Sequence, residues 1–254
     1  MKIQFICLAS GSSGNCFYLG TETYGILIDA GIPVRVIKQN LKDVGIPFER
    51  VCAVFVTHDH ADHIDRPFWR ELARLGCKAK FLVPAYVAAD VVRDTGLKRT
   101  QVIGFRQGES ITIGGIKATA VASAHERLEF DRRGRSRNLG FVLETKGRRI
   151  YHSGDCCLYE GLQTTLAKFG RFDAAFLPIN GRDAWRLTHD FIGCMDEHEA
   201  VELAGDLGVK VLVPGHHDMF RPNLGNVKEC VAFAKAKYPK LKVIVPQTGK
   251  EQRI

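Results

Sequence analysis

Short apolar stretches rich in β-branched residues alternate along the chain with longer segments whose apolar residues recur at helical spacing. We expect the short stretches to form β-strands and the longer, periodic segments to form helices. The predicted strands are Ile3–Leu8, Cys16–Leu19, Gly25–Asp29, Ala53–Thr57, Lys80–Val83, Ser110–Ile113, Ile116–Val121, Gly140–Glu144, Arg149–His152, Ala174–Leu177, Val211–Val213 and Val243–Val245. The predicted helices are Val34–Val44, Pro67–Leu75, Ala85–Thr95, Glu160–Phe169, Glu197–Leu207 and Asn226–Lys237.

Short motifs add detail to this assignment of strands and helices. The Gly-Gly pair at 114–115 predicts a hairpin between the strands on either side of it. Asp196, with Glu199 three residues further on, predicts a capping box at the start of the helix Glu197–Leu207. Hairpins and strand–helix–strand segments occur together, and no repeat or linker divides the sequence. We therefore expect a single α/β domain over residues 1–254, with mixed sheets and helices packed outside them.

Composition excludes several classes of protein. Of the 254 residues, 45% are hydrophobic and 25% are charged, which excludes a disordered chain, a collagen and a coiled coil. No apolar run reaches the roughly 20 residues that a membrane-spanning helix needs. The apolar N-terminal stretch is also too short for a secretory signal. These features predict a cytoplasmic protein that does not enter a membrane.

The cysteine content and the net charge give weaker evidence on function. The chain has eight cysteines but no C-x-x-C pair, so we expect reduced, structural thiols. The formal net charge is +8. Part of it is concentrated in one arginine-rich stretch, which is either a solvated loop or a rim that attracts phosphate. The arginines of this stretch are Arg127, Arg132, Arg133, Arg135 and Arg137.

Side chains with metal-binding chemistry follow four of the apolar runs, at the point where each run ends. The first group, His58-Asp59-His60-Ala61-Asp62-His63, comes directly after the strand that ends at Thr57. His125, Asp155 and His216 follow three later runs in the same way. Rigid sheets commonly present their functional groups at strand ends. We therefore expect these four parts of the chain to meet.

Imidazole and carboxylate groups in this combination indicate a metal site. His58 and His60 are two residues apart, so both rings face the same side of an extended segment. Asp62 and His63 follow at once and approach from another angle. Imidazole nitrogen with carboxylate oxygen is the ligand set of Zn, Mn or Fe at hydrolytic centres. The sequence therefore predicts a hydrolytic metal centre.

These residues resemble the motifs of the metallo-β-lactamase fold. The segment His58–His63 matches its H-x-H-x-D-H motif, and the three later single residues match in order and approximate spacing. The opening segments Leu8–Asn15 and Ile28–Gly31 resemble the YycJ-type proteins, which are thought to be nucleases. The segments Ile150–Asp155 and Leu177–Asp183, with the residues around His216, resemble the UlaG-type proteins, which include L-ascorbate-6-phosphate lactonases. The resemblance implies a four-layer αββα sandwich.

The resemblance also implies a set of ligands for two divalent metal ions. His58, His60 and His125 would bind the first ion. Asp62, His63 and His216 would bind the second ion, and Asp155 would bridge both. The ligand types do not decide between Zn and Mn, and Fe is compatible as well.

A shared water molecule between two such ions would be the nucleophile. Ions about 3.5–4 Å apart lower the pKa of that water towards 7 and yield a metal-bound hydroxide. Asp62 would be both a ligand and a catalytic proton acceptor. No nucleophilic side chain is then required, and we interpret Ser12, which lies between glycines, as part of a turn near the metal edge.

Residues near these motifs are candidate substrate contacts. Asn180 and Arg182 follow the strand Ala174–Leu177. Asn180 could orient a ligand or a substrate oxygen, and Arg182 could pair with a phosphate or carboxylate. The alternative for this stretch is a turn with a structural Arg–Asp pair. His217 stands where relatives often have an aromatic residue, and it could contact substrate, support His216 or replace it as a ligand.

Three classes of function remain open. The first is a metal-dependent hydrolase of a small anionic substrate, such as a phosphoester or the lactone of L-ascorbate 6-phosphate. The second is a YycJ-type nuclease or phosphodiesterase, for which the opening segments and the net charge of +8 argue. The third is a non-catalytic metal-binding or sensing protein, which ranks last because all the expected ligands are present. UlaG-like relatives form oligomers, so a homo-oligomer is also compatible with the resemblance.

Overall fold

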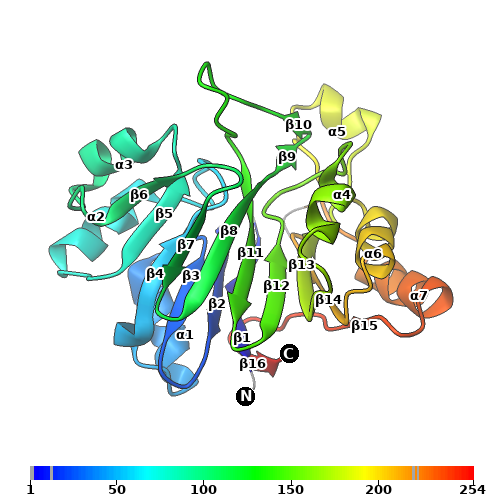
Figure 1. Cartoon of the computed structure of the whole chain (residues 1–254), viewed down its shortest axis with the longest axis horizontal. Helices are drawn as coiled ribbons and strands as arrows, with labels where there is room; N and C mark the ends of the chain where they lie inside the picture. The colour runs from blue at the N-terminus through cyan, green and yellow to red at the C-terminus, as the bar shows by residue number, and fades with distance from the viewer. Residues whose placement is uncertain (1–2, 12–13, 219–220, 222) are drawn as a thin grey trace.

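The computed structural model describes residues 3–11, 14–218, 221 and 223–254, and its strands form two seven-stranded sheets that face each other (Figure 1). Ser12 lies outside the described residues. The order in the first sheet is β16-β1-β2-β3-β4-β5-β6. Its strands are β1 (Gln4–Ala9), β2 (Cys16–Gly20), β3 (Gly25–Ile28), β4 (Val51–Phe55), β5 (Lys80–Pro84), β6 (Val102–Phe105) and β16 (Glu251–Arg253).

The second sheet has the order β15-β14-β13-β12-β11-β8-β7. In both sheets one part is antiparallel and the other part is parallel, β3 to β6 in the first and β12 to β15 in the second. The strands of the second sheet are β7 (Ser110–Ile113), β8 (Ile116–Ala122), β11 (Leu139–Thr145), β12 (Arg148–His152), β13 (Ala174–Pro178), β14 (Val211–Gly215) and β15 (Lys242–Val243). A short ribbon of β9 (Ala124–His125) and β10 (Arg127–Leu128) extends beyond it.

Helices cover the outer face of each sheet and complete four layers (Figure 1). The predicted αββα sandwich is therefore confirmed. A 3-10 turn (Phe48–Arg50) precedes β4, and α5 (Ala184–Thr188) lies near the β9–β10 ribbon. The helices over the first sheet are α1 (Val34–Asp43), α2 (Arg66–Arg74) and α3 (Ala88–Thr95), and those over the second are α4 (Leu162–Ala167), α6 (Glu197–Asp206) and α7 (Val227–Lys237).

The alternation of side chains along each strand explains why the apolar runs are continuous. In β1, Phe5 packs between the two sheets, whereas Ile6 packs against the helices on the outer face. Both faces of the strand are thus buried, as in sheets covered on both sides. Aromatic rings join the sheets: Phe55 lies edge-on to Phe141 with ring centroids 5.3 Å apart. This packing fixes the sheets relative to each other, and with them the strand ends at their common edge.

Several elements differ from the sequence prediction. The strands β6 and β16 were not predicted, because β6 contains Gly104 and β16 is the polar sequence Glu-Gln-Arg. The pairing of β16 with β1 across the whole length of the sequence decides its structure. The short helix α5 was also missed. The predicted capping box at Asp196 is present, with both of its hydrogen bonds to Glu199. Among the described residues, no helix is long and apolar enough to cross a membrane.

Candidate metal centre

The four predicted groups of metal-binding side chains converge at one edge of the sandwich. The segment His58–His63 follows β4, His125 ends β9, Asp155 follows β12 and His216 follows β14. The Oδ2 atom of Asp155 is at their centre: it lies 3.2 Å from Nε2 of His216 and 3.9 Å from Nε2 of both His58 and His125. Segments more than 150 residues apart in the sequence therefore share one site.

Three imidazoles form the first part of the cluster. Nε2 of His58 lies 3.1 Å from Nδ1 of His60, and the ligand atoms of His58, His60 and His125 all lie within 4.8 Å of one another. The Nδ1 atom of His58 lies 3.0 Å from Oγ1 of Thr57, which can accept a hydrogen bond from a protonated Nδ1. Nε2 of His58 is then left unprotonated, as metal coordination requires.

The second part of the cluster contains the carboxylates of Asp62 and Asp155, next to His63. Nε2 of His63 lies 3.3 Å from Oδ2 of Asp62 and 3.5 Å from Oδ2 of Asp155. The ligand atoms of His58, His63 and Asp155 also fall within 4.8 Å of one another. Asp155 therefore lies between the two groups of imidazoles, where a bridging carboxylate would have to lie.

A buried carboxylate behind the cluster fixes the orientation of His63. Oδ2 of Asp29 lies 2.8 Å from Nδ1 of His63 and accepts hydrogen bonds from Thr57 as well. A carboxylate on one ring nitrogen holds the other nitrogen as the free donor. Asp29 directly follows β3, where the backbone has a φ of 58°. Asp29 belongs to the segment Ile28–Gly31 but was not among the predicted site residues, although it follows a strand as the ligands do.

Asn15 supports the neighbouring carboxylate. Its Nδ2 atom donates a hydrogen bond to Oδ2 of Asp62 (3.0 Å) and lies 3.2 Å from Nε2 of His63. Its backbone N–H donates to the carbonyl of Asp62 (2.6 Å), and its own carbonyl accepts from Gly31 (3.1 Å). A Cβ atom on Gly31 would lie 1.8 Å from the carbonyl oxygen of Asp62. Only glycine at position 31 therefore allows the backbone to approach the carbonyl group of Asp62 this closely.

Burial and mutual charge set the protonation of the cluster. Burial lowers the pKa of His58 well below its ordinary value and that of His125 to about 4, so both imidazoles are neutral at pH 7. Burial opposes the ionisation of Asp155, but His216 and His63 outweigh it and hold the pKa of its carboxyl well below the usual range. His63 is the exception, because Asp29 and Asp155 outweigh burial and raise its pKa, so a cation bound there would have to displace a proton. Neutral imidazoles such as His58 and His125, with an ionised carboxylate, are the donor state that divalent cations bind. The cluster therefore fits such cations.

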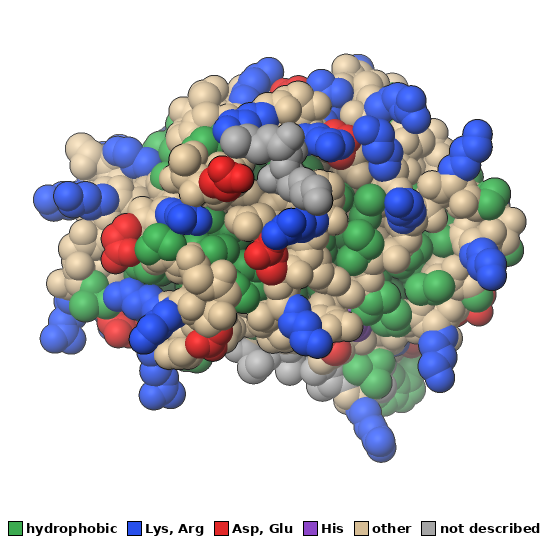
Figure 2. All heavy atoms as spheres, turned by 90° about the horizontal axis from the view of Figure 1, so that it is seen from below, with side chains coloured by type: hydrophobic (Ala, Val, Ile, Leu, Met, Phe, Trp, Pro, Cys, Tyr) green, Lys and Arg blue, Asp and Glu red, His purple; other side chains and the backbone are tan. Residues whose placement is uncertain are grey.

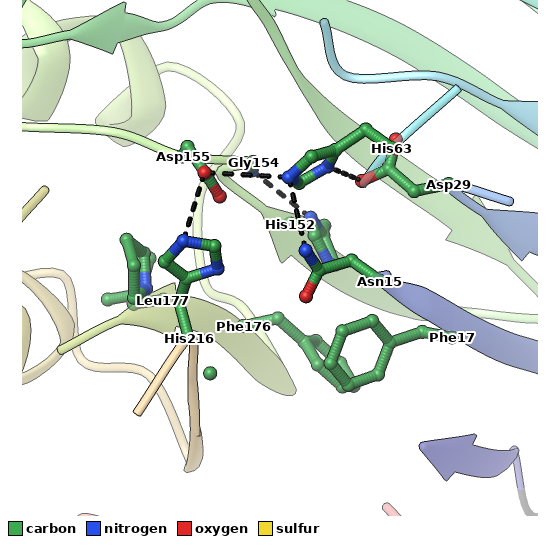
Figure 3. A pocket seen from close by; sticks show the side chains of 12 residues that line it. Asn15, Phe17, Asp29, His63, His152, Gly154, Asp155, Phe176, Leu177 and His216 are labelled. Carbon is green, nitrogen blue, oxygen red and sulfur yellow. Dashed lines mark hydrogen bonds and ion pairs between the residues drawn. The ribbon is translucent and has the colours of Figure 1, made fainter. Parts of the chain in front are cut away.

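A small cavity of about 30 Å³ lies beneath the cluster (Figure 3). His63, Asp155 and His216 face it from one side, and the ring of Phe176 closes the other side. His152 lines it too, stacked on Phe176 with ring centroids 5.7 Å apart, and its Nδ1 accepts a hydrogen bond from the backbone of residue 154. This volume is enough for one or two water molecules next to the cluster.

The predicted substrate contacts lie in two loops near the centre. The guanidinium of Arg182 forks onto the carboxylate of Glu199, with both N–O distances 2.7 Å. Arg182 is thus held by a glutamate of α6, and an Arg–Asp pair of the kind considered as the alternative joins Nε of Arg186 to Oδ2 of Asp183 (3.3 Å) in the same stretch. Nδ2 of Asn180 donates to Asn223, while Oδ1 of Asn180 and Nε2 of His217 are buried with no partner among the described residues.

The arginine-rich stretch lies at the same end of the molecule as the cluster. It includes β10 and the loop to β11, which projects beyond the sheets (Figure 1). Arg135 is bound to Asp131 and Arg137 lies over the ring of Tyr86. Arg132 and Arg133 are exposed. Basic side chains are also scattered over the opposite end, which carries both termini (Figure 2), so the net charge is not confined to this stretch.

The fold and this cluster together define a metal-dependent hydrolase of the metallo-β-lactamase fold. A family model described as beta-lactamase superfamily domain matches residues 24–217, and the chain belongs to this family. A UPF0173 metal-dependent hydrolase from Pyrococcus abyssi is 29% identical over 231 residues, which cover 89% of this chain and 90% of the relative.

Two further similar proteins match different shares of this chain. The exodeoxyribonuclease YycJ of Bacillus anthracis is 29% identical over 135 residues, 51% of this chain and 48% of the relative. The structure of Igni18, a metallo hydrolase from Ignicoccus hospitalis, covers the whole chain with a TM-score of 0.75 and 22% identity, over 99% of its own length. The similarity to Igni18 supports the fold, and the YycJ-type similarity noted in the sequence is present in about half of the chain.

Proposed function

We propose that this protein hydrolyses a small anionic substrate, a phosphoester or a sugar-phosphate lactone, at the centre around Asp155. The observation that carries the proposal is the convergence of the imidazoles of His58, His63, His125 and His216 within 3.9 Å of one carboxylate oxygen, Oδ2 of Asp155. We assign His58, His60 and His125 to one divalent cation and Asp62, His63 and His216 to another, with Asp155 between them; Zn and Mn both suit these ligands.

Bound divalent cations supply Lewis acidity, which lowers the pKa of a water molecule to about 7 and stabilises negative charge on a substrate oxygen. The protein's own groups prepare the site for this chemistry. Asp29 keeps the proton of His63 on Nδ1, away from the cluster. The Asp62 carboxylate, which accepts a hydrogen bond from the amide of Asn15, is both a ligand and a proton acceptor. No serine or cysteine nucleophile is required.

The experiment is a substrate panel for purified, metal-loaded protein that contains phosphomonoesters, phosphodiesters and sugar-phosphate lactones. We expect turnover of at least one class, which is lost in His58→Ala and after chelation. The matched control is His198→Ala, because His198 is exposed on α6 and outside the cluster. Absence of turnover across the panel, or equal activity of His58→Ala, would contradict the proposal.

A nuclease is the second candidate, and a specific feature favours it. Exposed aromatic rings accompany the arginines at this end of the molecule: Phe130 is 48% exposed and Trp185 on α5 is 50% exposed. Single-stranded nucleic acids bind where basic side chains follow the backbone and aromatic rings stack on bases. Metal-dependent cleavage of labelled single-stranded DNA at low salt would support this candidate, and its absence there would exclude it, because phosphate contacts are strongest at low salt.

A further inference from the structure

A buried thiol lies beside the cluster and was not among the predicted ligands. Cys194 belongs to the loop between α5 and α6 and is fully buried. Its Sγ atom, a ring nitrogen of His125 and a carboxylate oxygen of Asp155 all lie within 4.8 Å of one another. The imidazole of His125 is itself about nine-tenths buried and has no hydrogen bond among the described residues. Three potential ligands from three separate segments therefore face one point.

Neighbouring segments hold this thiol in place through its backbone. The carbonyl of Cys194 accepts a hydrogen bond from Arg182 (3.1 Å), whose guanidinium is fixed by Glu199. The N–H of Met195 donates to the carbonyl of Cys156 (2.8 Å). On the other side of the thiol, a Cβ atom on Gly193 would lie 2.5 Å from Cβ of Arg182, so the loop packs closely there. The sulfur is thus positioned by the fold itself.

The two nearby cysteines are oriented differently. The thiol of Cys156 donates to the carbonyl of Cys157 (3.2 Å), and the thiol of Cys157 donates to the carbonyl of Gly193 (3.4 Å). Neither thiol belongs to a group of potential metal ligands among the described residues. Only Cys194 of these three cysteines combines burial with ligand-forming neighbours, and Cys157 offers a matched control.

We propose that Sγ of Cys194 is an additional ligand of the cation that His125 and Asp155 bind, an inference that rests on the ligand set of the proposed function. The thiol releases its proton to solvent as the sulfur binds. A thiolate among nitrogen and oxygen ligands favours zinc over manganese, because the softer ligand suits the softer ion. This residue therefore gives the centre a preference for zinc that the histidines and aspartates alone do not give.

The test uses the whole protein loaded with cobalt(II) in place of the native ion. Sulfur ligation produces a thiolate-to-cobalt charge-transfer absorption in the near ultraviolet, which nitrogen and oxygen ligands do not produce. We expect this band in the wild type and in Cys157→Ser, and its loss in Cys194→Ser. X-ray absorption of the zinc-loaded wild type should likewise include sulfur at about 2.3 Å beside nitrogen and oxygen at about 2.0–2.1 Å.

Metal competition gives a second readout that does not depend on activity. Cys194→Ser should lower the affinity for zinc relative to manganese roughly tenfold or more, whereas Cys157→Ser should leave the ratio unchanged. If Cys194→Ser does not fold, the spectra of the wild type alone decide. Cobalt bound without a charge-transfer band, and zinc with nitrogen and oxygen neighbours alone, would overturn the sulfur ligand and leave the proposed function standing. Failure of the wild type to bind any of these ions would contradict the proposed function itself.

Discussion

The Nδ1 atom of His63 lies 2.8 Å from the carboxylate of Asp29, while the opposite nitrogen of the same ring faces Asp62 and Asp155. Both residues are buried, and they come from the ends of two neighbouring parallel strands, β3 and β4. The Asp29 carboxylate, together with that of Asp155, outweighs the effect of burial and raises the pKa of His63. Asp29 therefore acts on the metal cluster through the imidazole.

Replacing Asp29 by asparagine tests this relationship. The amide keeps the shape of the side chain but removes the charge that orients the imidazole of His63. We expect Asp29→Asn to weaken metal binding by about 10–100-fold, as is typical when a carboxylate behind a ligating histidine is lost. Titration with metal against a competing chelator measures this change.

The control for this variant is Asp90→Asn, because Asp90 is an exposed carboxylate paired with Arg93 on α3. It should bind metal as the wild type does. Wild-type affinity in Asp29→Asn would show that the carboxylate has no influence on the cluster.

Gly31 is predicted to be intolerant of any side chain. Its Cβ position is 1.8 Å from the carbonyl oxygen of Asp62, so alanine must displace the backbone of the H-x-H-x-D-H segment. We expect Gly31→Ala to lower the free energy of unfolding by about 1–3 kcal/mol, as overpacking commonly does, and to weaken metal binding at the same time. Urea denaturation with and without metal measures both effects. Gly11→Ala, whose nearest neighbour among the described residues is at 3.5 Å, should change neither.

The stability of the metal-free protein should depend on pH through its buried histidines, of which His152 contributes together with His58 and His125. Burial lowers the pKa of His152 from 6.5 to about 4, so the imidazole is neutral when folded and takes up a proton on unfolding between these values. The unfolded state then binds more protons, and the free energy of unfolding falls as the pH is lowered from 6.5 to 4. Asp29, His63 and Asp155 are the charged groups that act on this ring, and His63, with its raised pKa, contributes with the opposite sign above pH 6.5.

Denaturation of the chelator-treated protein at several pH values checks this expectation. His152→Phe retains an aromatic ring between Phe17 and Phe176 and should show a shallower loss of stability, with roughly one proton fewer taken up. Equal slopes for His152→Phe and the wild type would mean that this histidine is not held neutral by burial.

The sequence predicts the convergence at the metal centre because each of the four segments lies at the end of a strand or soon after it. His125 and His216 are 91 residues apart. However, β8, which leads into the ribbon strand β9, and β14 belong to one sheet, and this sheet brings both histidines to the same edge. The sandwich follows from the same pattern, since apolar runs without polar alternation require cover on both faces. Both the strand ends and the continuous apolar runs are local patterns, so they can be recognised in the sequence alone.

The remaining features depend on contacts that no local pattern contains. Cys194 lies in a loop without periodicity, and only the packing of that loop against Arg182 brings its sulfur to Asp155. Arg182 itself could be predicted as a charged residue near the site, but its partner Glu199 is 17 positions away and is recognised only in the folded chain. The strand β16 is polar and forms because β1 offers it a free edge.

Neutralising the exposed arginines at the site end tests how the substrate is attracted. The combined variant Arg132→Gln and Arg133→Gln removes two exposed charges from the loop between β10 and β11 without touching the cluster. We expect KM for an anionic substrate to rise several-fold with kcat unchanged, and the dependence of kcat/KM on salt to become weaker, because steering by surface charge is screened by ions. Steady-state kinetics at low and moderate ionic strength measure both quantities. Arg93→Gln on α3 is the control and should leave KM and the salt dependence unaltered.

A larger effect on single-stranded DNA than on a small phosphoester would favour the nuclease, because a polymer places several phosphates on this loop at once. An unchanged KM for both substrates would exclude the loop from substrate binding.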